Sequence, residues 1–130
     1  MFFFCDKEHE HEFKRLRTKR IVAGTSHDTD DYALAYYLLT ADSYLRKTLE
    51  RFMGDHPPGE IHWGQMIESK DVREDYRQLV YFAHQLYSGG WKNEDLYILK
   101  LLDSLSDKPN LREAFFEVCR RYLDGTIMEN

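Results

Sequence analysis

Hydrophobic residues along this chain recur mainly at the spacing of α-helices. The most apolar segment is a run of eight consecutive hydrophobic or aromatic residues, from Tyr32 to Leu39. A helix that is apolar on all sides is expected to be the most buried helix of a domain. A buried strand would also explain the run, but Ala33 and Ala35 favour a helix and no nearby segment offers strand partners. The pattern therefore predicts a central, buried helix.

Amphipathic helices are predicted on both sides of this segment. The first runs from about Asp6, a good N-cap residue, to about Arg20. Its acidic residues cluster at the start and its basic residues at the end, which suits the helix dipole. Asp42 is the expected N-cap of the helix that follows the central one. The apolar face of that helix carries Leu45, Thr48, Leu49 and Phe52.

The second half of the chain predicts three more helices. A long one begins near residues 69–71 and ends at Gly89-Gly90. Asn93 is the expected cap of the next helix, while Pro109 opens the last one and Gly125 ends it. The expected inward residues of the three are Val72, Tyr76, Leu79, Val80, Ala83 and Tyr87, then Ile98, Leu101, Leu102 and Leu105, and then Leu111, Phe115, Val118, Cys119 and Tyr122.

One strong cluster of helix breakers, residues 54–59, separates the two halves, and a short turn carrying Trp63 follows it. Together these segments predict an all-α fold, a compact single domain over residues 1–130 with about six helices in an orthogonal or bundle-like arrangement. The residues expected to be nearly fully buried are Leu34, Leu38, Leu79, Ala83, Leu102, Phe115 and Cys119.

Composition supports a globular domain, because 42% of the residues are hydrophobic, 15% aromatic and 32% charged. The net charge of −5 makes nucleic acid an unexpected partner. No apolar run approaches the roughly 20 residues that span a bilayer, so no membrane association is expected. Cys5 and Cys119 fit neither a disulfide framework nor a metal-binding pattern, and reduced thiols are typical of a cytoplasmic protein.

Two segments carry a resemblance to a known family. The first is Phe2-Phe3-Phe4 followed by Glu8-His9-Glu10-His11-Glu12-Phe13, and the second covers residues 76–89. With fainter likeness over residues 99–105 and 120–122, the chain resembles a family of small helical proteins of unknown function from Gram-positive bacteria and their phages. The resemblance implies a helical fold and a bacterial or phage origin. It implies no catalytic residue and no cofactor.

Two histidines near the start of the first helix raise the question of a metal site. On a helix, His9 and His11 point about 200° apart, so they cannot both bind one ion. Cys5 and His9 could share a face, but two ligands do not make a zinc site. We therefore expect solvated histidines on an acidic first turn, with no bound metal and no cofactor.

His27 and Asp28 give the strongest indication of enzymatic chemistry. Metal-dependent phosphohydrolases of all-α fold use a His-Asp pair with further ligands to create a metal-bound hydroxide. His9 or His11 could supply an earlier ligand, and Asp75 or Asp103 a later one. The competing explanation is that Asp28 and its acidic neighbours cap the buried helix. Whether His27 and Asp28 bind a metal stays open, and an enzyme is the less favoured prediction.

Two other groups of residues have a chemical and a structural interpretation. The basic run from Lys14 to Arg20 could contact nucleic acid, but a helix end that complements its dipole explains it equally well. Cys119 with His84 would be a nucleophile and its base. A cysteine on an apolar helix stripe is, however, more often an inert core residue.

The aromatic residues near element ends support a different kind of function. Trp63, Tyr87 and Trp91 are either lids on the core or anchors that bind a protein partner. The leading hypothesis is a non-enzymatic protein-interaction module, such as a phage or mobile-element accessory that binds a host protein. In this hypothesis these three residues contact the partner. The sequence does not fix the oligomeric state.

Overall fold

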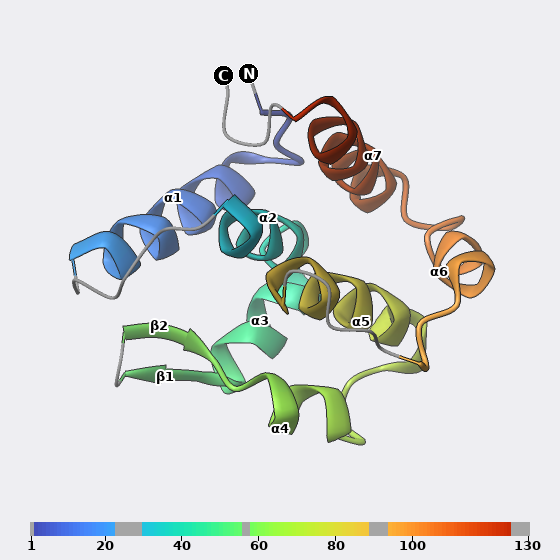
Figure 1. Cartoon of the computed structure of the whole chain (residues 1–130), viewed down its shortest axis with the longest axis horizontal. Coiled ribbons are helices and arrows are strands. Elements are labelled where there is room, and N and C mark those ends of the chain that lie inside the picture. The colour runs from blue at the N-terminus through green and yellow to red at the C-terminus, as the bar shows by residue number, and fades with distance from the viewer. Residues whose placement is uncertain (1, 23–29, 56–57, 89–93, 126–130) are drawn as a thin grey trace.

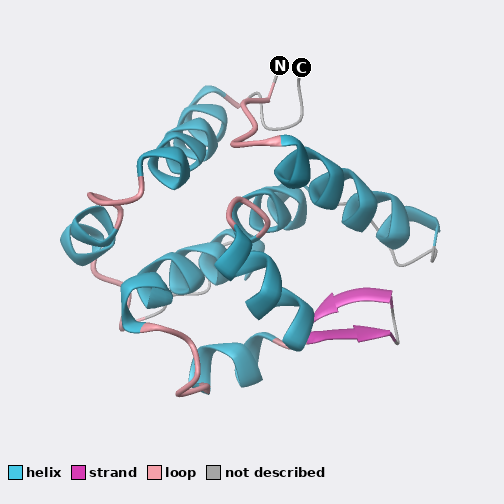
Figure 2. Ribbon diagram, turned by 180° about the vertical axis from the view of Figure 1, so that it is seen from behind, coloured by secondary structure: helices cyan, strands magenta, loops and turns pink. Residues whose placement is uncertain are grey.

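The computed structural model describes residues 2–22, 30–55, 58–88 and 94–125. Within these ranges the chain forms seven helices and one two-stranded antiparallel sheet (Figure 1). The all-α fold class is confirmed, with a small hairpin added at the edge of the molecule (Figure 2). In chain order the elements are α1 (Lys7–Val22), α2 (Asp30–Leu39), α3 (Ser43–Arg51), β1 (Met53–Asp55), β2 (Pro58–Ile61), α4 (Trp63–Glu68), α5 (Glu74–Ser88), α6 (Ile98–Ser104) and α7 (Pro109–Asp124).

The helix α2 lies at the centre of the fold and contacts α1, α3, α5 and α7 (Figure 1). Every side chain from Tyr32 to Leu39 is at most 2% exposed, so the prediction of a central buried helix is confirmed. Although α2 is strongly apolar, it has only 10 residues. None of the described helices combines the length and apolarity needed to cross a membrane.

Several helix ends lie where the sequence placed them, because capping residues define them. The carboxylate of Asp6 accepts a hydrogen bond from the backbone N–H of His9 at 2.8 Å, just before α1. Asp42 does the same for the N–H of Leu45 at 2.8 Å. Pro109 is the first residue of α7, and Gly125 ends this helix with a φ of 69°, which favours glycine.

Two helices begin later than the sequence predicts, because side chains hold the preceding backbone in other conformations. Before α5, the hydroxyl of Ser69 accepts a hydrogen bond from the N–H of Asp71 at 3.1 Å and stabilises a turn. Before α6, the amide of Gln78 donates to the carbonyl of Asp95 at 2.9 Å and accepts from the N–H of Tyr97 at 2.7 Å. These bonds fix the segment at residues 95–97 against α5. The predicted cap Asn93 lies outside the described residues.

The breaker cluster forms a hairpin rather than an open loop. Met53 pairs with Ile61, and Gly54 pairs with Glu60. Gly59 has a φ of 81°, and only glycine adopts this conformation readily. The sequence does not predict these strands, because they have three and four residues and no alternation of polar and apolar positions.

Two tyrosines of α2 anchor this hairpin to the centre of the fold. The hydroxyls of Tyr32 and Tyr36 both donate to the carbonyl of Gly59, at 2.9 Å for Tyr32. The hydroxyl of Tyr32 also accepts a hydrogen bond from the N–H of Ile61 at 3.0 Å. The buried tyrosine hydroxyls and the buried backbone groups of the hairpin thereby serve as each other's hydrogen-bond partners.

The N-terminal segment packs against three helices. The Phe2 ring lies under the guanidinium of Arg121, with 3.7 Å between the carbon Cζ and the ring centroid. The N–H of Phe3 donates to Glu117 at 3.3 Å, and the carbonyl of Phe3 accepts from the hydroxyl of Tyr37. Burial alone would raise the pKa of Glu117, but Arg120, Arg121 and the Phe3 N–H hold this pKa below its ordinary value. The segment thus connects α2 to α7.

The predicted core is confirmed in part. Leu34, Leu38, Leu79, Ala83 and Phe115 are buried. The prediction for Leu102 is wrong, because α6 turns Leu101 and Leu105 inward and leaves Leu102 41% exposed. On α7, Cys119 is only half-buried and Tyr122 is 57% exposed, because the helix turns Arg121 inward against Phe2.

The hydrogen bonds at Gly59 predict a difference between two similar substitutions. Tyr32→Phe removes a donor to Gly59 and leaves the N–H of Ile61 without this acceptor, so unfolding should become easier by about 2 kcal/mol. Tyr36→Phe leaves Gly59 bonded to Tyr32 and should cost about 1 kcal/mol or less. Urea denaturation measures both, with the exposed Tyr122→Phe as the control. Equal losses for the two variants would contradict this account of the anchor.

Candidate functional site

The three aromatic residues predicted to bind a partner lie in different environments. Trp63, the first residue of α4, is 8% exposed and stacks on Tyr87, with ring centroids 5.4 Å apart. Its ring also lies 5.0 Å from that of His84. This burial favours the core-lid interpretation of Trp63. Tyr87, near the end of α5, is 37% exposed, and Trp91 lies outside the described residues.

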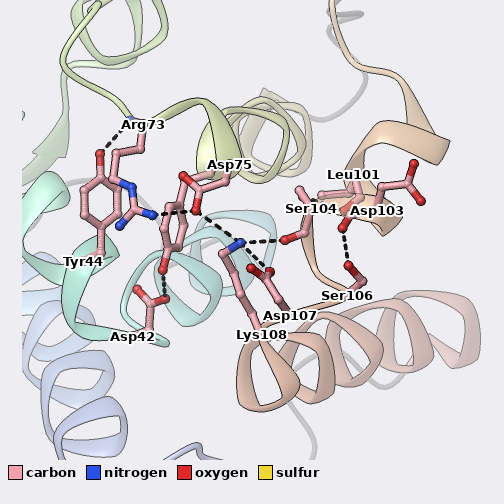
Figure 3. A network of polar contacts seen from close by, with 11 residues as sticks. Asp42, Tyr44, Arg73, Asp75, Leu101, Asp103, Ser104, Ser106, Asp107 and Lys108 are labelled. Carbon is pink, nitrogen blue, oxygen red and sulfur yellow. Dashed lines mark hydrogen bonds and ion pairs between the residues drawn. The ribbon is translucent and has the colours of Figure 1, made fainter.

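The residues of the hydrolase hypothesis are not brought together by what the structure describes. His27 and Asp28 lie outside the described residues, so their pairing stays a prediction. Asp75 accepts from Arg73 at 2.8 Å and pairs with Lys108 at 3.4 Å, while the Asp103 carboxylate points away from this network (Figure 3). Across the described ranges, no three His, Cys, Asp or Glu side chains lie close enough to hold a metal ion.

The network around Asp75 is better explained as a structural junction. The side chain of Lys108 is only 11% exposed. Its ammonium donates to the carbonyl of Ser104 at 2.7 Å and to the carboxylate of Asp107 at 3.0 Å (Figure 3). Nearby, the hydroxyl of Tyr76 donates to Asp42, the N-cap of α3, at 2.7 Å. Burial and the bond to Asp42 raise the pKa of Tyr76, so the phenol stays neutral. These contacts join α3, α5 and the start of α7.

His9 is buried, and the expectation of a solvated histidine is wrong. Its Nε2 lies 2.7 Å from the carbonyl of Tyr37, and its Nδ1 accepts the N–H of Cys5 at 3.1 Å. These partners require the neutral ring with the proton on Nε2. Phe4 and Tyr37 enclose the ring, with centroids 5.2 and 4.7 Å away. Both ring nitrogens are therefore engaged within the fold, which leaves neither available to bind a metal.

Two residues of the basic run of α1 form ion pairs with acidic residues of the same helix. Lys14 binds Glu10 at 2.9 Å, and Arg15 binds Glu12 at 2.8 Å. Beside them, α1, α3 and β1 line a groove of about 540 Å³. Both acidic and basic side chains line it, so the groove lacks the single-sign charge that would select a phosphate backbone. Its charged residues are Glu8, Glu12, Arg15, Lys19, Arg46, Lys47 and Glu50.

Neither cysteine is activated as a nucleophile. Burial, followed by the charges of Asp6 and Asp42, raises the pKa of the Cys5 thiol to about 11. The Cys5 thiol donates instead to the carbonyl of Asn110 at 3.3 Å. Burial also raises the pKa of Cys119. Both thiols therefore stay protonated near neutral pH, which is the reverse of what nucleophilic catalysis requires.

Exposed apolar side chains concentrate on the last two described helices. Of nine large hydrophobic residues that are exposed in the described part, seven lie between residues 97 and 123. Leu99 is 72% exposed and Leu123 is 84% exposed, so water covers most of both side chains. We call these seven residues the exposed apolar set: Tyr97, Ile98, Leu99, Leu102, Phe116, Tyr122 and Leu123.

A signal for this set is present in the sequence and was not recognised. Adjacent residues on a helix point about 100° apart, so both members of an apolar pair rarely face one core. Ile98-Leu99, Leu101-Leu102, Phe115-Phe116 and Tyr122-Leu123 are all such pairs. In each of these four pairs at least one member is exposed. Doubled apolar positions on α6 and α7 therefore mark surface that the domain itself does not cover.

The environment of His9 predicts a pH-dependent stability. Burial lowers the pKa of His9 to about 4, so between pH 6.5 and 4 the unfolded chain binds a proton that the folded chain does not. The free energy of unfolding should fall by about 2 kcal/mol between pH 7.5 and pH 5 through this residue alone. Urea denaturation of the wild type and of His9→Gln at both pH values isolates this contribution. An equal pH dependence in the two proteins would contradict the assignment.

Comparison with known proteins provides no relative for this chain. It matches no protein-family model, and no curated protein or solved structure is significantly similar to it. Its function is therefore inferred from the surface chemistry of the chain itself.

Proposed function

We propose that this protein is a non-enzymatic protein-interaction module, and that the exposed apolar set of α6 and α7 binds its partner. The observation that carries the proposal is a concentration along the chain. Of the nine large hydrophobic residues that are exposed in the described part, six lie on these two helices and a seventh, Tyr97, directly precedes α6. Hydrophobic residues scattered singly over a surface need no explanation, but a local concentration of them is typical of interaction sites. Aromatic members such as Phe116 and Tyr122 supply large contact areas with few torsions to restrict.

The chemistry of the described polar residues supports this proposal over an enzyme. His9 is engaged through both ring nitrogens, and Asp75 is engaged in ion pairs. The two thiols have raised pKa values. Each of these groups has a structural role and lacks the activation that general acid–base or nucleophilic catalysis needs.

The setting of the proposed interaction comes from the sequence. A cytoplasmic accessory protein of a bacterium or its phage, which binds a host protein, would suit the family resemblance and the reduced cysteines. Tyr87 and Trp91 remain proposed contacts at the end of α5. Trp63 would hold the Tyr87 ring in place by stacking on it, and would not contact the partner directly.

A charge placed within the exposed apolar set should abolish binding without unfolding the protein. Leu99 is 72% exposed, so Leu99→Glu should change stability by no more than about 0.5 kcal/mol. A charge at a binding hot spot should reduce capture of a host protein at least about tenfold. Affinity capture from a lysate of the encoding organism, quantified by mass spectrometry, measures this effect. Thr18→Glu on the exposed side of α1 is the matched control.

One outcome of this experiment would contradict the proposal. In that outcome, Leu99→Glu captures the same proteins as the wild type and the control, at the same yield, and thermal unfolding shows that all three proteins are folded.

A further inference from the structure

The helix α7 has an apolar face that the fold buries and a second apolar stripe that the fold leaves largely uncovered. The inner face contributes Leu111, Ala114, Phe115, Val118 and Arg121 to the interior. A second stripe runs along the outer side at positions i, i+3 and i+7. It consists of Phe116, which is 48% exposed, half-buried Cys119, and Leu123, which is 84% exposed. This spacing matches the a and d positions of a heptad, the pattern by which helices pair.

Charged residues flank the outer stripe in a defined order. Glu113 and Arg120 are seven residues apart, so they lie on the same edge of the stripe, at equivalent heptad positions. Glu113 is exposed, and its side chain forms no ion pair or hydrogen bond in the described part of the chain. The side chain of Arg120 is 53% exposed, and it contacts Glu117 at 2.8 Å and Asp124 at 3.8 Å on its own helix. One edge of α7 therefore presents a negative charge near its start and a positive charge near its end.

We propose that α7 pairs in antiparallel orientation with α7 of a second copy of this chain. In an antiparallel pair, equivalent edges of the two helices face each other and run in opposite directions. Glu113 of one copy then lies opposite Arg120 of the other, and the two-fold axis repeats this pair. In the same register, Phe116 packs against Cys119 of the second copy, and Arg112 lies beside Leu123 of the second copy.

The charges select this arrangement over the alternatives. A parallel, in-register pair would place Arg112 against Arg112 and would align the two helix dipoles unfavourably. The antiparallel pair places opposite charges at both ends of the interface and opposes the dipoles. A second copy is the occupant that this surface specifies, because a two-fold interface needs a self-complementary patch and the order of charges on α7 provides one.

The inference rests on the proposed function, because the outer stripe of α7 belongs to the exposed apolar set. It assigns one part of that set to self-association and leaves the α6 residues Ile98, Leu99 and Leu102 for a different partner. An interface of two heptads per helix is small, so the dimer is a weak and concentration-dependent one.

Analytical ultracentrifugation of the full chain and its charge variants tests the pairing. The wild type should dimerise reversibly, and Glu113→Arg alone or Arg120→Glu alone should weaken the dimer at least tenfold, since each places like charges opposite one another. An equimolar mixture of the two variants should restore a dimer of near wild-type affinity, because each variant supplies the charge that the other lacks. Glu94→Arg, the same change of charge at an exposed loop residue, is the control and should dimerise normally.

A further variant guards against loss of folding. Arg120 contacts Glu117, which holds the N-terminal segment, so Arg120→Glu is accepted only if its circular dichroism and thermal unfolding match the wild type. Leu123→Glu avoids this contact and should also yield a folded monomer. A wild type that stays monomeric up to about 1 mM would overturn the inference, because any pairing would then have a Kd above about 1 mM. Folded single variants that dimerise like the wild type, or a mixture that stays monomeric, would overturn it as well.

The failure of this inference is distinguishable from failure of the proposed function. Leu99→Glu lies on α6, outside the proposed dimer interface, and should leave dimerisation unchanged while it abolishes capture of the host protein.

Discussion

The structure depends on one constraint, the burial on every side of the apolar segment of α2, a helix of 10 residues. From Tyr32 to Leu39, no side chain of α2 is more than 2% exposed, so this helix needs apolar neighbours on every side. The helices α1, α3, α5 and α7 supply them. An isolated helix of this length is marginal in water, so α2 owes its stability to that packing. These four helices form a shell around it, and α4 and α6 pack against α5.

Burying three tyrosines and a histidine at the centre imposes a second requirement, because their polar groups need partners. Each finds a backbone carbonyl. Tyr32 and Tyr36 donate to Gly59, Tyr37 donates to Phe3, and Nε2 of His9 meets the carbonyl of Tyr37. The hairpin and the N-terminal segment therefore stabilise the interior, because they supply hydrogen-bond acceptors for the tyrosine hydroxyls buried there.

The sequence predicted the features that depend on local patterns. The apolar run of α2, the caps Asp6 and Asp42, and Gly125 at the end of α7 were all predicted from residue types and spacing. It did not predict the features that depend on distant contacts. His9 was expected in solvent because the Phe4 and Tyr37 rings that enclose it are set by tertiary packing. Leu102 was placed inside because it lies on the apolar stripe of α6, whereas the packing of this helix turns only Leu101 and Leu105 fully inward. The predicted aromatic site was likewise local in origin. The exposed apolar set was not predicted, because the doubled apolar positions on α6 and α7 show only indirectly which residues face away from the core.

Amide hydrogen exchange, measured by NMR on the full chain, tests the central role of α2 most directly. If the shell depends on this helix, the amides of residues 36–39 exchange only when the whole protein unfolds. Their free energy of opening should then equal the free energy of unfolding measured with urea, as the most protected amides of a cooperative domain do. Faster exchange in α2 than in α5 and α7 would show that the outer helices persist without it, which would contradict the account.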